Sequence, residues 1–151
     1  MGKAPRNQSV ARAVSPRPSA QRSETMRAVK SRDTGPELRV AELLRSAGVR
    51  YRRDVARLPG RPDFVIASAK TVVFVHGCFW HGHHCPRGAR VPKQNRKYWQ
   101  EKVARNRRRD RRVARQLRAE GYSVWTVWEC RLKHEGLSKR LLTRLVAGPA
   151  N

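Results

Sequence analysis

Acidic side chains are scarce in this sequence: 11 Asp and Glu stand against 35 Lys and Arg, which gives a formal charge of +24 over 151 residues. Self-repulsion of this size opposes compaction, so a polyanionic partner is the simplest explanation for it. Arginine outnumbers lysine, and because the planar guanidinium group suits phosphate, nucleic acid is the favoured partner. An anionic membrane surface is the alternative from charge alone.

Long hydrophobic runs are also absent. The longest, residues 71–75, is far too short to cross a bilayer, and no apolar signal-peptide core follows the N-terminus. We therefore expect a cytoplasmic protein without a membrane segment. Hydrophobic residues make up 38% of the chain, which allows one domain with a modest core and leaves little for a second.

Cysteine is rare, and three cysteines cannot all pair as disulfides. They are Cys78, Cys85 and Cys130. Four of the five histidines and two of the cysteines fall within residues 76–85. With His83, the cysteines would supply three thiolates and one imidazole, a common closed tetrahedral set for a structural zinc ion. His84 could replace His83 as the ligand, and Cys130 could instead be a buried core cysteine.

The chain divides by composition into an arm and a domain. Residues 1–24 hold three prolines, several serines and five basic residues, with no acid before Glu24. They show no periodicity, so we predict a disordered basic arm, and order should begin near Met26. Residues 25–148 would then form one folded domain.

Periodicity predicts an α/β domain with a small mixed sheet flanked by helices. A first helix opens at Pro36, presents Leu38, Ala41, Leu43 and Leu44 as an apolar stripe and stops at Gly48. A weak strand over 49–55 and a turn over 58–63 come next. The segments 64–67 and 71–75 are predicted to form a hairpin, and the second of them should be buried on both faces.

The second half of the domain begins with a loop over 76–92. A long helix follows over about 95–120 and ends at Gly121, and its inward stripe reads Trp99, Val103, Asn106, Asp110, Val113 and Leu117. A further strand over 122–128 and a closing amphipathic helix over 137–146 complete the pattern.

The sequence offers candidates for hydrolysis of a phosphodiester, which needs a positioned water, a base and positive charge on the phosphoryl oxygens. Asp63 opens a strand after a turn, where its carboxylate would lie at a sheet edge and hold Mg²⁺, unless it is a turn aspartate. Asp110 lies among arginines yet on an inward stripe, so it needs a partner. That partner is an arginine in a salt bridge or an imidazole such as His81, oriented as a base.

The remaining histidines and the aromatic residues have two interpretations each. His81 could also be a zinc ligand or a loop residue bonded to backbone, and His76, at the end of the central strand, contacts the scissile phosphate or caps the strand. Phe79, Trp80 and Trp99 lie in basic segments, where aromatic rings stack on bases or wedge between them. In the alternative interpretation they cover the zinc site and fill the core.

Four runs together resemble the very-short-patch repair (Vsr) endonucleases. They are residues 58–64 (LPGRPDF), 73–81 (VFVHGCFWH), 83–85 (HHC) and 127–130 (VWEC). Residues 26–29 (MRAV) and 31–34 (SRDT) look like the start of that family's domain. The match spans roughly residues 24 to 133, in order and with compatible spacing.

The resemblance implies a fold related to the PD-(D/E)xK restriction nucleases, with a structural zinc site. The activity would be nicking of one strand of duplex DNA on the 5′ side of the thymine in a T:G mismatch, which arises when 5-methylcytosine deaminates. The endonuclease domain would span 25–148. The protein would be a monomer at the bacterial nucleoid, with mismatch-repair proteins as further partners.

The resemblance also implies individual roles. Asp63 would be a Mg²⁺ ligand, His81 the base and Asp110 its partner, while His76 and Glu37 match positions associated with the active site. The zinc ligands would be Cys78, His83, Cys85 and Cys130. The DNA contacts would be the aromatic wedge, together with the part that reaches across the other groove: Phe79, Trp80, Trp99 and Met26.

The central strand departs from the general nuclease pattern, which places an acid and a lysine near Val73 and Val75. Neither is present here. The resemblance implies that the backbone carbonyl of residue 75 is the second metal ligand. Val75 stands where some family members carry threonine; a carbonyl ligand survives that change, but a hydroxyl role does not.

Two other functions are compatible with the same charge and cysteines. The first is a non-enzymatic, zinc-stabilised nucleic-acid-binding protein, which would have no use for Asp63 and Asp110. The second is a nuclease of broader mismatch or sequence range. Nicking of a T:G duplex with Mg²⁺ or Mn²⁺ separates the enzyme from the binding protein.

Overall fold

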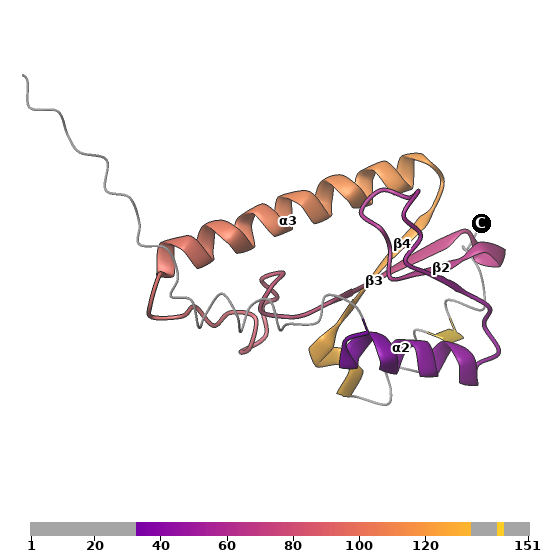
Figure 1. Cartoon of the computed structure of the whole chain (residues 1–151), viewed down its shortest axis with the longest axis horizontal. Helices are drawn as coiled ribbons and strands as arrows, with labels where there is room; N and C mark the ends of the chain where they lie inside the picture. The colour runs from indigo at the N-terminus through magenta and orange to yellow at the C-terminus, as the bar shows by residue number, and fades with distance from the viewer. Residues whose placement is uncertain (1–32, 134–141, 144–151) are drawn as a thin grey trace, which may run out of the picture. The chain divides into compact units, whose positions relative to one another are not determined.

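The computed structural model describes residues 33–133 and 142–143 (Figure 1). The predicted basic arm at 1–24 and the domain start near Met26 lie outside these residues. Of the predicted closing helix over 137–146, only residues 142–143 are described; they are helical, and Leu142 packs against the core.

A four-stranded mixed sheet forms the centre of the domain, in the order β1-β2-β3-β4. The strands are β1 (Arg52–Arg53), β2 (Phe64–Ile66), β3 (Thr71–His76) and β4 (Ser123–Trp128). β1, β2 and β3 pair antiparallel, whereas β3 and β4 pair parallel over six residues each. The predicted hairpin and the small mixed α/β sheet are therefore confirmed.

The strand predicted over 49–55 is mostly wrong, because only Arg52 and Arg53 pair with β2. Both arginine side chains are exposed, whereas Val49 and Tyr51 before them pack against the core without pairing with β2. Asp54 follows with a left-handed φ of 55°, and this backbone conformation ends the extended segment.

The helix α2 (Gly35–Ser46) begins at Thr34, whose side chain caps it, and has a proline in its first turn. Its buried face is made by Val40, Ala41 and Leu44. Leu38, which we predicted on this face, is 49% exposed. That prediction is wrong because Val40, Ala41 and Leu44 follow helical spacing from residue 37, whereas residue 38 lies about 100° round the helix from it.

The long helix α3 (Arg96–Ala119) packs on the sheet mainly by its C-terminal half, through Val113 and Leu117. It ends before Gly121, which has a φ of 82° that glycine adopts without strain. The turn before β2 touches the same helix: a Cβ at Gly60 would lie 2.5 Å from Val113 Cγ1. Only glycine therefore lets this turn and α3 approach so closely.

Two apolar clusters bury the two faces of the sheet, and Figure 1 shows α2 and α3 on opposite sides of it. The α2 side is centred on Leu44, Phe64, Ile66, Val73 and Val127. The α3 side is centred on Leu58, Val65, Val72, Val113 and Leu117. Alternate residues of β2 and β3 therefore enter opposite clusters, as the two-residue period of a strand requires. Among the described residues, no helix combines the length and apolar character needed to cross a bilayer.

Candidate active site

Asp63 lies immediately before β2, where its side chain extends the β2–β3 pairing. Its Oδ2 accepts a hydrogen bond from the backbone N–H of Val75 at 2.7 Å. Burial raises the pKa of the carboxyl above its ordinary value, and the nearby Glu37 carboxylate acts in the same direction. The Val75 hydrogen bond and the charges of Arg53 and His81 oppose this shift. A cation bound next to this half-buried carboxylate would stabilise its ionised form and lower its raised pKa.

Glu37 is held by the start of α2. Its Oε1 accepts from Thr34 Oγ1 at 2.8 Å, and its Oε2 accepts from the Asp33 N–H at 3.0 Å. The Glu37 N–H also donates to Thr34 Oγ1 at 3.5 Å, so the two residues cap the helix reciprocally in a variant of the capping box, with the Asp33 N–H in place of that of the N-cap residue. Arg53 donates to the same Oε2 at 3.1 Å. Glu37, which we predicted near the active site, is 6% exposed. Its carboxylate oxygens are occupied by the helix cap and by Arg53, and its negative charge raises the pKa of Asp63.

His81 and Asp110 form the closest polar pair of the site. Nδ1 of His81 lies 2.6 Å from Oδ2 of Asp110, which comes from the middle of α3. Arg109 donates to the other carboxylate oxygen at 3.2 Å. Burial raises the pKa of Asp110, but the hydrogen bond to His81 and the surrounding positive charges outweigh it and leave the pKa below its ordinary value. Asp110 therefore remains ionised and faces an imidazole.

His76, the last residue of β3, stacks on His81 with ring centroids 3.8 Å apart and planes 10° from parallel. Its edge packs against Trp128 of β4. Burial, followed by the charge of His81, lowers the pKa of His76 to about 4. His76 is consequently neutral at physiological pH and offers either a lone pair or an N–H to a ligand.

The loop that carries His81 is fixed to α3 on both sides of this residue. Gly82 has a φ of 61°, and a Cβ there would lie 2.6 Å from Val103 Cγ1. Asn106 Nδ2 donates to the carbonyl of Trp80 at 2.9 Å, one helical turn before Asp110. The imidazole therefore meets the carboxylate because the flanking backbone is held against the helix.

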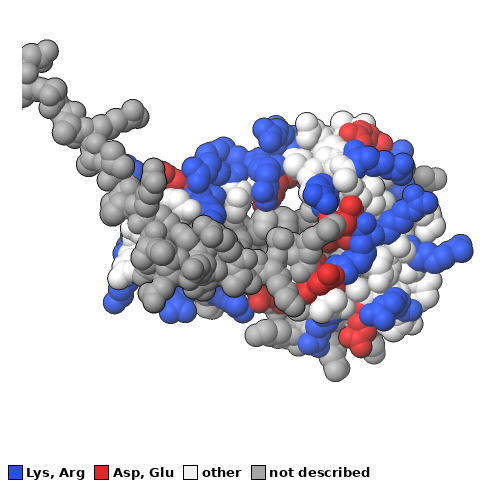
Figure 2. Space-filling view, viewed as in Figure 1, with Lys and Arg blue, Asp and Glu red and all other residues white. Residues whose placement is uncertain are grey.

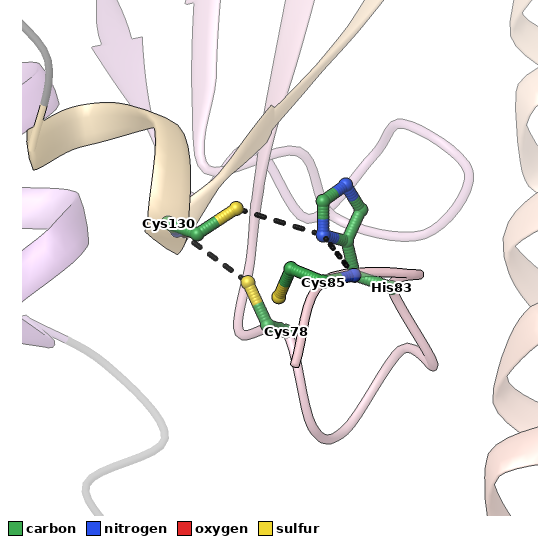
Figure 3. Close-up of side chains that lie close together, drawn as sticks. All are labelled: Cys78, His83, Cys85 and Cys130. Atoms are coloured by element: carbon green, nitrogen blue, oxygen red, sulfur yellow. Dashed lines mark hydrogen bonds between the residues drawn. The ribbon is translucent and has the colours of Figure 1, made fainter. Parts of the chain in front are cut away.

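A second cluster braces the same loop (Figure 3). It consists of the side chains of Cys78, His83, Cys85 and Cys130, whose ligand atoms all lie within 4.8 Å of one another. The first three come from the loop and Cys130 from the turn η2 (Glu129–Lys133) after β4. Of the two neighbouring histidines, His83 is buried and belongs to the cluster, whereas His84 is exposed.

The cysteine thiols differ in their acidity, although they lie side by side. Burial raises the pKa of Cys78 to about 12, while a hydrogen bond with the His83 ring lowers the pKa of Cys85 to about 6. The Cys130 N–H donates to Cys78 Sγ at 3.4 Å. Three sulfurs and one imidazole nitrogen around one point are a donor set for a soft or borderline metal ion, so this cluster could hold a metal.

Comparisons with known proteins identify the family of the chain. The family model for DNA mismatch endonuclease Vsr matches residues 17–87. The chain is 46% identical over 125 residues to DNA mismatch endonuclease Vsr of Escherichia coli, an alignment that covers 82% of this chain and 80% of the relative. The chain belongs to the Vsr family.

Two further relatives carry the name of nicking enzymes. The type II nicking enzyme V.NmeAIP of Neisseria meningitidis is 42% identical over 127 residues, covering 84% of this chain and 90% of the relative. The type II nicking enzyme V.XorIIP of Xanthomonas oryzae is 45% identical over 121 residues, covering 80% and 88%. The Vsr likeness thus extends over most of the chain and over most of each relative.

The three aromatic residues that we predicted to contact DNA form one cluster at the N-terminal end of α3. The rings of Phe79, Trp80 and Trp99 lie with centroids between 5.1 and 5.9 Å apart, and all three are half-buried. Lys102 places its Nζ 5.4 Å from the Trp80 centroid and 5.2 Å from that of Trp99. Met26, the fourth predicted DNA contact, lies outside the described residues.

Sequence reasoning missed three residues that contact the side chains or the loop of this candidate site. Asn106 lay on the predicted inward stripe but received no role; a polar residue on that stripe was the available signal. Lys102 and Arg53 gave no signal in the sequence. Lys102 lies beside aromatic rings and Arg53 pairs with Glu37 only through tertiary contacts, and the chain contains many other lysines and arginines.

Proposed function

We propose that this protein nicks one strand of duplex DNA on the 5′ side of the thymine in a T:G mismatch, with Mg²⁺ as cofactor. As a member of the Vsr family it is a DNA-cleaving hydrolase. The observation that carries the proposal is the 2.6 Å contact between His81 and Asp110. His81 also lies close enough to the half-buried Asp63 for its charge to lower the pKa of that carboxyl. A protein that only bound nucleic acid would have no use for this arrangement.

His81 acts as the general base. With Nδ1 donating its hydrogen to Asp110, the lone pair is on Nε2. Nε2 takes a proton from water as the water oxygen bonds to phosphorus, and the bond from phosphorus to the leaving sugar oxygen breaks; that oxygen takes a proton from solvent. Asp110 stabilises the imidazolium that results. His76, neutral and stacked on His81, donates an N–H to a phosphoryl oxygen.

Asp63 and the backbone carbonyl of Val75 would hold the Mg²⁺ ion. Both are hard oxygen donors of the kind that this ion prefers. The Val75 N–H uses Oδ2 of Asp63, and no donor among the described residues uses Oδ1. When bound, Mg²⁺ supplies positive charge to the phosphoryl oxygens.

The thiol cluster would hold a structural Zn²⁺ ion through Cys78, His83, Cys85 and Cys130. Such an ion would tie the loop around His81 to the end of β4, and the Arg87–Glu129 ion pair of 2.9 Å joins the same two segments. We further propose that the fold is related to the PD-(D/E)xK nucleases, because Asp63 opens a strand beside the central strand β3. The enzyme would act as a monomer in the cytoplasm.

A nicking assay tests the proposed function. Duplexes with T:G, with each other mismatch and with no mismatch are incubated with wild type and Asp63→Ala, with Mg²⁺, with Mn²⁺ and without added metal. The expected result is one nick 5′ of the mismatched thymine, dependent on metal and lost in Asp63→Ala. Equal nicking of several mismatches would favour the broader nuclease, and binding without nicking under every condition would favour the non-enzymatic protein.

A further inference from the structure

A cavity of about 1020 Å³ opens between α3 and β4, with His76, His81 and Asp110 among the residues that line it. Thr126 and Trp128 of β4 contribute on the sheet side, and nearly all of the remaining lining is arginine from α3, eight residues in total. We call this cavity the arginine groove. In the face shown in Figure 2, Lys and Arg side chains lie over α3 and also over other parts of the described surface.

Packing does not explain these arginines. The face of α3 that is buried against the sheet uses Val113 and Leu117, and Arg111, Arg115 and Arg118 are exposed. Within residues 33–133 and 142–143, Arg109 is the one arginine of the groove that pairs with a carboxylate, that of Asp110. Like charges three or four residues apart on a helix repel one another, so the groove has a cost that an anionic partner would remove.

The arginine groove extends along α3 on both sides of Asp110, with four of its arginines before that residue and four after it. The two sides differ in what lies beyond them. Trp99 precedes Asp110 by eleven positions and Arg118 follows it by eight, which places them about 16 Å and about 12 Å away along the helix at 1.5 Å per residue. The ring cluster therefore lies toward one end of α3, the His81–Asp110 pair near its middle, and the arginines past Asp110 toward the other end. The small side chain of Ala114 lines the groove between Arg111 and Arg118.

We propose that the arginine groove binds the backbone phosphates of the duplex arm on the 5′ side of the nick, through Arg111, Arg115 and Arg118. The inference rests on the proposed function, with the cut on the 5′ side of the thymine, and on the ring cluster of Phe79, Trp80 and Trp99 as the part that contacts the mismatch on the 3′ side of the cut. The strand must then leave the His81–Asp110 pair in the opposite direction, into a groove of guanidinium groups whose planar forks suit phosphate oxygens. These contacts are independent of base sequence.

Substitution of Arg111, Arg115 and Arg118 by glutamine tests the proposal. A matched control replaces Arg39, Arg50 and Arg57, three exposed arginines away from the groove, and removes the same charge. Affinity for a T:G duplex is measured against salt concentration. The groove variant should lose on the order of 10²-fold in affinity near physiological salt, and its salt dependence should weaken by about 0.9 in log–log slope for each lost phosphate contact. The control variant should change little.

Shortened duplexes identify the arm. Removing the 5′ arm should weaken wild type and leave the groove variant almost unchanged, whereas removing the 3′ arm should weaken both equally. Thr126→Glu, on the opposite wall, should act like the groove variant without touching α3. Equal losses in the groove and control variants, or sensitivity to the 3′ arm alone, would overturn the proposal. Because binding is the readout, an absence of nicking by wild type would count against the proposed function and leave this test standing.

Discussion

Nδ1 of His81 lies 2.6 Å from Oδ2 of Asp110, although 29 positions separate the two residues. A half-buried carboxylate that accepts from one ring nitrogen fixes the tautomer and leaves the other nitrogen free to take a proton. The stack of His76 on the same ring fixes its plane. Asp110 therefore orients His81, and its negative charge is placed to stabilise the imidazolium that forms in the reaction.

Asp110→Asn should lower the saturated nicking rate by about 10²- to 10⁴-fold, with a smaller change in KM. The amide keeps the size of the carboxylate, but it lacks the charge that stabilises the imidazolium. The measurement is single-turnover nicking of a T:G duplex. Glu101→Gln, which removes an exposed negative charge from the same helix, is the matched control; equal rates for the two variants would remove Asp110 from the mechanism.

Asp63→Asn should raise the melting temperature at neutral pH without added Mg²⁺. The pKa of Asp63 is raised in the folded protein, chiefly by burial, so the folded state holds this proton more tightly than the unfolded chain. Ionisation at neutral pH therefore costs stability, and the cost fades as the pH falls through the folded pKa toward the unfolded one. The advantage of the variant, whose amide oxygen still accepts from Val75, should shrink toward about pH 4.

The same variant separates a metal ligand from a turn residue. Mg²⁺ should raise the melting temperature of wild type, because an ion that binds only the folded state stabilises it, and should leave that of Asp63→Asn unchanged. Nicking should be lost. A variant that is less stable than wild type and keeps its Mg²⁺ response would mean that Asp63 serves the turn before β2.

His83→Ala and His84→Ala distinguish the proposed zinc ligand from its neighbour. His83 lies buried among the three thiols and His84 is exposed. Purified wild type should contain about one zinc ion per chain. His83→Ala should lose zinc and melt at a lower temperature, whereas His84→Ala should keep both properties. Full zinc content in His83→Ala would show that the cluster does not need this imidazole.

The sequence predicts best those elements whose pattern is set by the core. The buried strand β3, the hairpin with β2 and the long helix α3 all follow from apolar periodicity, and α3 ends at Gly121 as predicted. Leu38 was placed on the wrong face because it is three residues before Ala41, which fits the spacing of an apolar helix stripe approximately. β1 is two residues long because only Arg52 and Arg53 pair with β2 and Asp54 has a left-handed φ, and neither property follows from the apolar pattern.

The candidate site was predictable in its residues and not in its geometry. Spacing and histidine density indicated the residues of both clusters, yet they left His83 against His84 and an arginine against His81 as open alternatives. Whether Asp110 meets His81 depends on Gly82 and Asn106, which hold the loop against α3. Such contacts join segments some twenty residues apart, and no local pattern records them.

Trp80→Ala should weaken binding of a T:G duplex by about 10- to 100-fold, the cost of losing one ring that stacks on a base, and should weaken binding of a matched duplex less. A mismatched pair opens more easily, so the ring gains more there. Tyr98→Ala is the control, since this ring is 43% exposed and also lies beside Trp99 and Lys102. The measurement is the ratio of the two dissociation constants for each variant. An unchanged ratio together with a lower melting temperature would mean that Trp80 packs the loop instead of contacting the mismatch.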